Sequence, residues 1–136
     1  MRILGIDYGD VRIGVAVSDP LGFTAQGLET IQNRGKKSVL EALVKICAEY
    51  AVGEVVIGLP INMNGTIGPR AQGVMDLVPQ LEDALKVPVK TWDERLSSRQ
   101  VERFMLEGGL SRQKRKDNSD RLAATLILQT YLESKR

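Results

Sequence analysis

Residues 2–17 read RILGIDYGDVRIGVAV. The run at residues 2–6 is apolar and leads into a polar turn at residues 7–10, and the run at residues 13–17 is again apolar and rich in β-branched residues. Apolar runs of this length, bounded by glycine and aspartate, are typical of strands joined as a hairpin. The stretch therefore predicts the first two strands of a sheet, with Asp7 directly after the first.

The rest of the chain alternates between strand and helix patterns. Apolar residues recur with helical spacing in three segments, and two short apolar runs are typical of buried parallel strands. In order, we expect a third strand at residues 23–31, a helix at 37–50, a strand at 54–58, a helix at 71–85, a strand at 88–92, a short helix from residue 97 that ends at Gly108-Gly109, and a final helix at 122–132. This order predicts an α/β fold, a mixed five-stranded sheet with helices on both faces.

The composition limits the chemistry that the chain can perform. A length of 136 residues with 43% hydrophobic residues is enough for one core, so we expect a single domain over residues 1–136. Histidine is absent, which excludes Ser-His-Asp and Cys-His catalysis and the usual histidine-rich zinc sites. Cys47 is the only cysteine, so no disulfide can form within the chain. Catalysis would therefore rest on carboxylates, metal ions, lysine or arginine.

No segment of the sequence is typical of a membrane or secreted protein. Runs of about 18 uncharged apolar residues are absent. Residues 1–10 turn acidic before the apolar region of a signal peptide develops. We therefore expect a cytoplasmic protein without a membrane partner.

Three carboxylates stand at the edges of the predicted elements. Asp7 follows the first strand, Glu94 follows the last strand by two residues, and Asp120 stands at the start of the final helix. Sites in such sheets lie beyond the carboxyl ends of the parallel strands, and the small Ala123 and Ala124 would let the final helix approach that edge. Converging carboxylates repel one another unless a cation lies among them, and Mg²⁺ or Mn²⁺ prefers such oxygen ligands. The sequence thus favours a divalent-metal site at these three residues.

Each carboxylate also has an ordinary structural explanation. Asp7 could simply end a strand, Glu94 could pair with Arg95, and Asp120 could favour a helix N-terminus through its dipole. Taken singly, these explanations are the stronger ones, and only the family resemblance described next reverses that order for the three together. Asp10, close to Asp7, is more typical of a solvated turn than of the outer shell of a metal site.

Four blocks of sequence follow one another in a distinctive order. They are Gly5-Ile6-Asp7-Tyr8-Gly9 with Arg12-Ile13-Gly14-Val15-Ala16, then Val56-Ile57-Gly58-Leu59-Pro60-Ile61-Asn62-Met63-Asn64-Gly65, then Asp93-Glu94-Arg95-Leu96, and finally Asp120 with Ala123-Ala124. In this order they resemble the YqgF family, also called RuvX, over nearly the whole chain. That family is similar to the RuvC Holliday-junction resolvases, and its members are described as resolvases or as nucleases that mature the 5′ end of precursor 16S ribosomal RNA.

The resemblance implies a ribonuclease-H-like fold and hydrolysis of phosphodiester bonds, with 5′-end processing of precursor 16S ribosomal RNA as the expected reaction. It assigns catalysis and metal binding to Asp7, Glu94 and Asp120. Two ions, Mg²⁺ or Mn²⁺, would activate water and stabilise the leaving 3′ oxygen. Asn118-Ser119 departs from the apolar pattern expected before Asp120, and we interpret this pair as the N-cap of the final helix.

Polar residues around the expected site would hold the nucleic acid. Asn62, Asn64 and Arg70 belong to a loop that leaves the sheet at that edge, where they could approach phosphate. Arg95 is adjacent to Glu94 and would orient it or bind phosphate. A flexible surface loop with an ordinary arginine at a helix start is an equally good interpretation of the loop.

A cluster of cations precedes Asp120. The net charge is only +2, but Arg112, Lys114, Arg115 and Lys116 place four cations within five residues. They would contact the phosphate backbone without reading sequence, although such runs are also typical of solvated turns. Aromatic residues make up only 4% of the chain, so recognition of a structured nucleic acid by shape and backbone is expected rather than base stacking.

Two other functions fit parts of the sequence. Asp-x-Gly followed by a Gly-Val-Ala strand also occurs in sugar kinases and actin-like ATPases, but those proteins need two related halves and this chain has the length of one. A ribonuclease-H-like module that binds RNA without cutting it is the stronger rival, and the three acidic positions favour the enzyme over it. The sequence leaves open whether the substrate is RNA or a four-way DNA junction, and whether the protein is a monomer or a homodimer.

Overall fold

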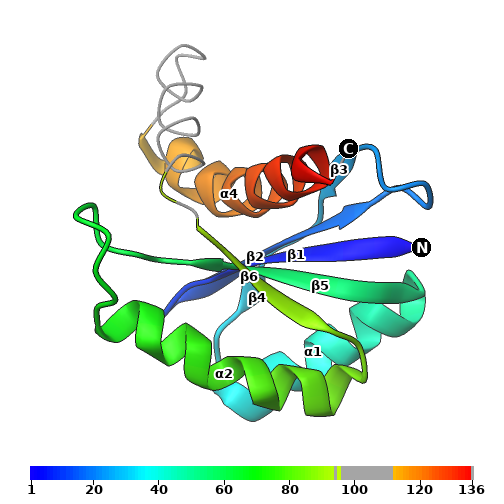
Figure 1. Cartoon of the computed structure of the whole chain (residues 1–136), viewed down its shortest axis with the longest axis horizontal. Helices are drawn as coiled ribbons and strands as arrows, with labels where there is room; N and C mark the ends of the chain where they lie inside the picture. Colours follow the sequence, from blue (N-terminus) through cyan, green and yellow to red (C-terminus); the bar gives the residue numbers. More distant parts are fainter. Residues whose placement is uncertain (94, 96–111, 136) are drawn as a thin grey trace.

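The computed structural model of the chain describes residues 1–93, residue 95 and residues 112–135, with side chains from residue 121 onward in the last range. A central sheet lies between two layers of helix (Figure 1). The elements are β1 (Arg2–Tyr8), β2 (Arg12–Ser18), β3 (Ala25–Gly27), β4 (Ile31–Gln32), α1 (Lys36–Glu49), β5 (Val52–Leu59), α2 (Pro69–Leu85), β6 (Val89–Asp93) and α4 (Arg112–Ser134). The short helix predicted from residue 97 lies outside the described residues.

The sheet contains both parallel and antiparallel pairs. β1 pairs antiparallel with β2 and parallel with β5, and β5 pairs parallel with β6. β3 and β4 both pair antiparallel with β2, which gives the order β3-β2-β1-β5-β6 with β4 also beside β2. Because β1, β5 and β6 run in the same direction, their carboxyl ends share one edge, and this edge is where a site is expected.

The third predicted strand is divided in two, so the described part of the sheet has six strands rather than five. β3 pairs with one end of β2, at Ala16–Ser18, and β4 pairs with the other end, at Arg12 and Ile13. Between them Leu28 packs into the core, while its N–H donates to the Val15 carbonyl at 2.8 Å. The predicted mixed sheet with helices on both faces is confirmed, and only the strand count was wrong.

Helices α1 and α2 cover one face of the sheet (Figure 1). Side chains alternate between the two faces along a strand, and on β1 Leu4 and Ile6 point toward these helices. On α1 the buried residues Val39, Leu43 and Cys47 recur every four positions, so one stripe of the helix faces the sheet. The predicted helices at 37–50 and 71–85 are confirmed to within two residues. This face carries the larger apolar core.

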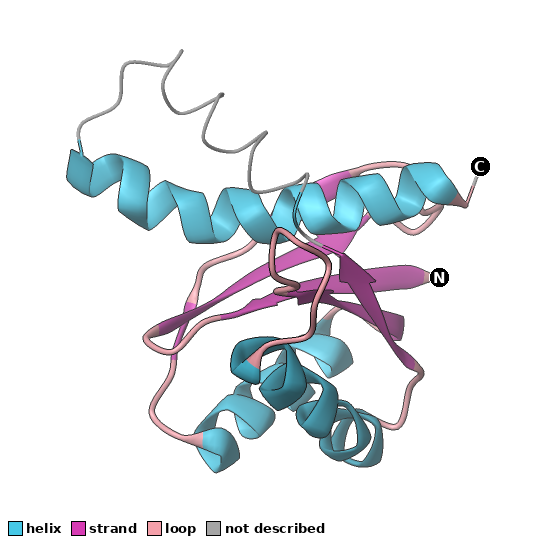
Figure 2. Ribbon diagram, turned by 60° about the vertical axis from the view of Figure 1, so that its left-hand side comes forward, coloured by secondary structure: helices cyan, strands magenta, loops and turns pink. Residues whose placement is uncertain are grey.

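Among the described elements, helix α4 covers the opposite face (Figure 2). Its apolar stripe includes Ala124 and Leu128, both fully buried, and it rests on the strands at Gly5. A Cβ added at Gly5 would lie 2.8 Å from Leu128 Cβ and 3.1 Å from the Ala124 carbonyl oxygen, so only glycine allows this approach. The predicted close packing of the final helix through small residues is confirmed at Ala124. No helix in the described residues has the length and apolar character needed to cross a bilayer.

The final helix begins ten residues earlier than predicted, at Arg112 instead of residue 122. Asp120 therefore lies inside the helix, and the interpretation of Asn118-Ser119 as an N-cap is wrong. The helical spacing of apolar residues did not predict these turns of the helix, because residues 112–121 are all polar or charged. Arginine, lysine and glutamine are nevertheless good helix formers, so the charged run extends the helix without needing the core.

Candidate functional site

Asp7 lies at the carboxyl edge of the sheet, on the face that α4 covers. It is the second-last residue of β1 rather than the residue after it. Ile3 packs into the cluster beneath α4, while Leu4 and Ile6 pack into the cluster beneath α1 and α2. Alternation along the strand therefore directs the Asp7 side chain, which is partly buried, toward α4.

The two sheet positions beside Asp7 are both glycines. Gly14 on β2 is the register partner of Asp7, and Gly58 on β5 is one residue beyond Ile57, the partner of Ile6. Both glycines have the parity of residues that face α4, namely Ala16 and Val56. Neither neighbouring strand therefore places a side chain next to the Asp7 carboxylate. The sequence contains both glycines, but their juxtaposition with Asp7 emerges only from the register.

Helix α4 carries position 120 toward the same edge. Its C-terminal part contacts the beginning of the parallel strands, where Tyr131 meets Glu54, and Ala124 lies over Gly5 in the middle of β1. The helix therefore runs antiparallel to β1, and residues nearer to its N-terminus lie nearer to the carboxyl end of β1, where Asp7 stands. Position 120 is one turn before Ala124 on the same stripe. The direction of the Asp120 side chain lies outside the described residues.

Glu94, the third predicted ligand, also lies outside the described residues, but both of its neighbours are described. Arg95 donates from Nε and Nη2 to Asp93 Oδ2 at 3.0 and 2.6 Å, and its backbone N–H donates to Asp93 Oδ1 at 3.0 Å. The hydrogen bond from the guanidinium holds the pKa of Asp93 below its ordinary value of 3.8, so this carboxylate is ionised at neutral pH. Asp93 was not predicted as a site residue, and nothing in its spacing distinguishes it from Glu94.

The loop between β5 and α2 is held by its own polar side chains. Asn62 donates from Nδ2 to Thr66 Oγ1 at 3.0 Å, and Asn64 Oδ1 accepts from the Thr66 hydroxyl at 2.6 Å. Arg95 Nη1 reaches the Met63 carbonyl at 3.5 Å, which links the loop to the end of β6. Asn62 and Asn64 thus have an internal role, and their predicted contact with phosphate stays a prediction.

Apart from Arg95, the predicted phosphate-binding cations occupy two different places. Arg70 is the second residue of α2 and lies at the carboxyl edge, but on the face opposite to Asp7. Arg112, Lys114, Arg115 and Lys116 fall in the first turns of α4, on the same helix as Asp120. The structure describes the backbone of these four residues, which form part of a helix rather than a turn.

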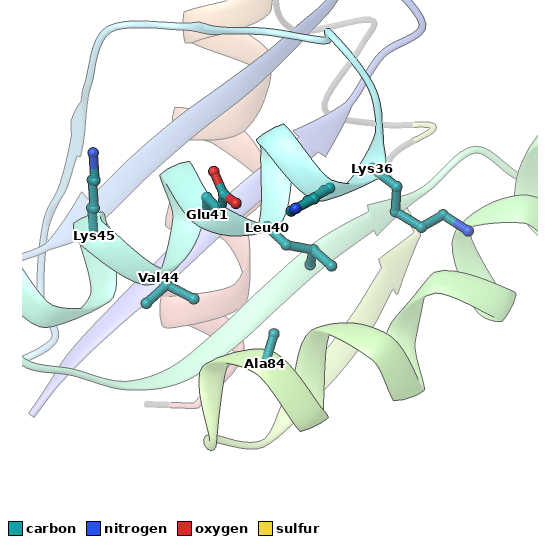
Figure 3. A pocket seen from close by; sticks show the side chains of 7 residues that line it. Lys36, Leu40, Glu41, Val44, Lys45 and Ala84 are labelled. Carbon is teal, nitrogen blue, oxygen red and sulfur yellow. The ribbon is translucent and has the colours of Figure 1, made fainter.

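A surface hollow of about 730 Å³ lies between α1 and α2, where Leu40 and Val44 of α1 face Ala84 of α2 (Figure 3). It offers apolar contact but few groups for hydrolytic chemistry. Among the described residues, no group of three or more acidic or cysteine side chains is placed to hold a metal ion. The only expected ligand whose side chain is described is Asp7.

Comparison with known proteins agrees with this fold. A family model described as "RuvX: Holliday junction resolvase" matches residues 1–134. The chain is 51% identical over 133 residues to a protein of Syntrophomonas wolfei and 54% identical over 134 residues to one of Clostridium novyi, both named "Putative pre-16S rRNA nuclease". These matches cover 98% of this chain in each case, and 94% and 99% of the two relatives.

Two solved structures share the fold at low sequence identity. RuvC of Thermus thermophilus in complex with a Holliday junction is 18% identical, with a TM-score of 0.60, over 99% of this chain and 95% of that one. The Holliday junction resolvase of fowlpox virus is 12% identical, also with a TM-score of 0.60, over 100% of both chains. From the full-length family match and the relatives that share half of its sequence, this chain belongs to the RuvX family.

Proposed function

We propose that this chain is a divalent-metal-dependent nuclease that hydrolyses phosphodiester bonds in the 5′-end processing of precursor 16S ribosomal RNA. The single observation that carries the proposal is the setting of Asp7, a carboxylate between two glycine positions at the carboxyl edge, with position 120 of α4 directed to the same edge. The names of the two relatives supply the RNA substrate. We further propose that it acts as a single domain over residues 1–136 and works in the cytoplasm.

The ligands proposed for the metal are Asp7, Glu94 and Asp120. Carboxylate oxygens are the ligands that Mg²⁺ and Mn²⁺ prefer, and the two strands beside Asp7 carry glycine at the neighbouring positions, Gly14 and Gly58. Two bound ions would supply an activated water and stabilise the leaving 3′ oxygen. β1 is paired on both sides, which fixes the backbone at Asp7, and position 120 lies within α4. The chain has no histidine, so the carboxylates must position the reacting groups.

The cations would hold the substrate strand around this site. Arg112, Lys114, Arg115 and Lys116 precede Asp120 by one to two turns of α4, a spacing that suits contacts with the phosphates next to the cut. Asn62, Asn64, Arg70 and Arg95 would act from the other side of the edge, with the loop kept in shape by the contacts of Asn62, Asn64 and Arg95. Structured RNA would thus be recognised through its backbone.

A second candidate function is resolution of four-way DNA junctions, which the description of the matching family model favours. The two functions differ in substrate but share the same carboxylates. A non-catalytic RNA-binding module is the third outcome that an experiment must separate.

The test is cleavage of a precursor 16S ribosomal RNA fragment and of a four-way DNA junction by the purified protein, side by side. With Mn²⁺ or Mg²⁺ the RNA should be cut, and excess chelator should abolish cleavage. Ca²⁺ should support binding but little turnover, because its looser coordination relaxes the geometry. Full cleavage in chelator would contradict the metal site. Paired cuts in the junction with intact RNA would establish the resolvase, and binding without any cleavage would establish the binding module.

A further inference from the structure

A polar hollow lies at the carboxyl edge, on the face away from Asp7. Its volume is about 330 Å³, at the lower end of the range of pockets that hold small ligands. Tyr8 and Pro60 form part of its wall, and Asp10 of the β1–β2 turn, Lys36 of α1 and Arg70 of α2 bring charged groups to it.

The backbone fixes where these charges stand. Asn33 connects the start of α1 to the β1–β2 turn, since its Nδ2 donates to the Gly9 carbonyl at 2.9 Å and its N–H donates to the Val11 carbonyl at 2.9 Å. Lys36, the first residue of α1, is thereby held near Asp10 in that turn. Pro69 at the first position of α2 presets the backbone for Arg70.

The three charged side chains line one hollow but form no ion pair with one another. Within the part of the chain that the structure describes, Asp10, Lys36 and Arg70 take part in no ion pair or side-chain hydrogen bond. Two cations and one carboxylate leave an excess of one positive charge. A simple anion would gain from the cations and be repelled by Asp10, whereas a ligand with both a phosphate and a hydroxyl would suit all three groups.

We propose that this hollow binds one ribonucleotide unit of the RNA strand. Its phosphate would bind Lys36 and Arg70, and its ribose 2′-hydroxyl would donate a hydrogen bond to Asp10. The inference rests on the proposed nuclease function and extends it to the choice between RNA and DNA. Arginine holds phosphate through paired hydrogen bonds, and the 2′-hydroxyl is the group by which proteins distinguish RNA. DNA would leave the Asp10 carboxylate without a donor.

The position of the hollow suits a strand that passes over the edge of the sheet. Asp7 and Tyr8 are consecutive residues of β1 whose side chains leave the strand on opposite faces. A strand that crosses the end of β1 therefore passes from the Asp7 face to the hollow beside Tyr8.

The test is a titration of the full chain with adenosine 5′-monophosphate, its 2′-deoxy analogue and inorganic phosphate. Binding is monitored through the NMR shifts of the backbone amides. The ribonucleotide should shift the amides of Tyr8, Lys36 and Arg70 and bind about tenfold more tightly than the deoxynucleotide, the ratio expected for one charge-assisted hydrogen bond. Equal affinity for the two nucleotides, or shifts elsewhere on the protein only, would overturn the proposal.

Variants separate the roles of the charges. Arg70→Gln should weaken both nucleotides by about tenfold, because it removes one charge-assisted phosphate contact. Asp10→Asn should bring the two nucleotides to similar affinity, and an unchanged preference for ribose would contradict the role of Asp10. Lys37→Gln is the matched control, since Lys37 neighbours Lys36 but does not line the hollow, and it should bind like the native protein.

The same titration on Asp7→Asn distinguishes this proposal from the nuclease itself. That variant should keep nucleotide binding in the hollow, which lies on the other face. Intact cleavage without ribonucleotide binding in the hollow would remove the inference and leave the nuclease. Ribonucleotide binding in a protein that cuts nothing would support the hollow as a nucleotide site and remove the nuclease.

Discussion

The two faces of the sheet serve different purposes. The face beneath α1 and α2 holds the larger apolar cluster, and no buried polar side chain lies on it among the described residues. The face beneath α4 has a smaller cluster, and it carries the two buried polar residues, Ser18 and Glu54, together with Asp7. Because neighbouring residues of a strand face opposite ways, one strand supplies both faces at once. The larger apolar core and the buried polar side chains are thereby placed on opposite faces of the same sheet.

The polar residues on the α4 face fix the position of the helix. Glu54, only 6% exposed, accepts a hydrogen bond from the Tyr131 hydroxyl at 2.6 Å and lies 3.4 Å from Lys135 Nζ. Burial alone would raise the pKa of Glu54, but the hydrogen bond from Tyr131 and the charges of Lys135 and Lys90 outweigh it and hold the pKa below 4.5. The contacts of Glu54 with Tyr131 and Lys135 fix the C-terminal part of α4 on the sheet. They therefore also influence the position of residue 120 near the other end of the helix.

The largest effect on stability is expected on the α1/α2 face, for Leu43→Ala. Leu43 is fully buried, and its truncation should lower the free energy of unfolding by about 2–5 kcal/mol through lost burial and a residual cavity. Cleavage by the folded molecules should be unchanged, because Asp7 lies on the other face. Urea unfolding and cleavage assays measure the two quantities. The adjacent Val44→Ala, at a 42% exposed position, is the control and should cost little. Loss of cleavage by folded Leu43→Ala protein would show that packing on the α1/α2 face affects the site at Asp7.

Gly5→Ala tests the α4 face. The added Cβ would lie 2.8 Å from Leu128 Cβ, so α4 must shift, at a cost of about 1–3 kcal/mol in unfolding free energy. Cleavage should fall as well, because the same helix carries Asp120. The control is Gly73→Ala on α2, where an added Cβ meets nothing within 4 Å and should raise stability by about 0.5–1 kcal/mol. Native stability of Gly5→Ala would show that α4 does not rest on Gly5.

These contrasts also mark what the sequence can predict. Helices α1 and α2 could be predicted from the helical spacing of their apolar residues, and strands β5 and β6 from short apolar runs. Both patterns are local in the sequence. The division of the third strand depends on where β3 and β4 meet β2, and the early start of α4 falls in residues 112–121, which include no apolar residue. Asp7 could be selected from its place after an apolar run. Its two glycine neighbours could not, since Gly14 and Gly58 become adjacent only through pairing of distant segments.

A smaller effect is expected for Glu54→Gln, which keeps the shape but removes the charge that Tyr131 and Lys135 contact. At neutral pH the loss should be about 1.5–2 kcal/mol, the lower part of the range for a hydrogen bond to a charged group. The pKa of Glu54 is lower in the folded chain than its ordinary value of 4.5. The unfolded chain therefore takes up the proton first, and the stabilisation is complete above pH 4.5 and disappears as the pH falls through the lowered pKa.

Unfolding measured from pH 7 to pH 3 should thus show the native protein approaching Glu54→Gln in stability at the acid end. Asp83→Asn, at a side chain that is 89% exposed, is the control and should track the native protein throughout. A constant difference between native protein and Glu54→Gln over the whole range would contradict the lowered pKa.

If Asp7 on the α4 face binds metal and takes part in catalysis, Asp7→Asn should remove cleavage without unfolding the chain. The amide keeps the shape of the side chain but removes a negative charge, which weakens coordination of a hard cation. With Mn²⁺ and precursor 16S ribosomal RNA, the cleavage rate should fall by about 100-fold or more, while melting temperature is kept and RNA affinity holds or rises. Asp83→Asn should cleave like the native protein. Cleavage by Asp7→Asn at the native rate would exclude Asp7 from the catalytic site.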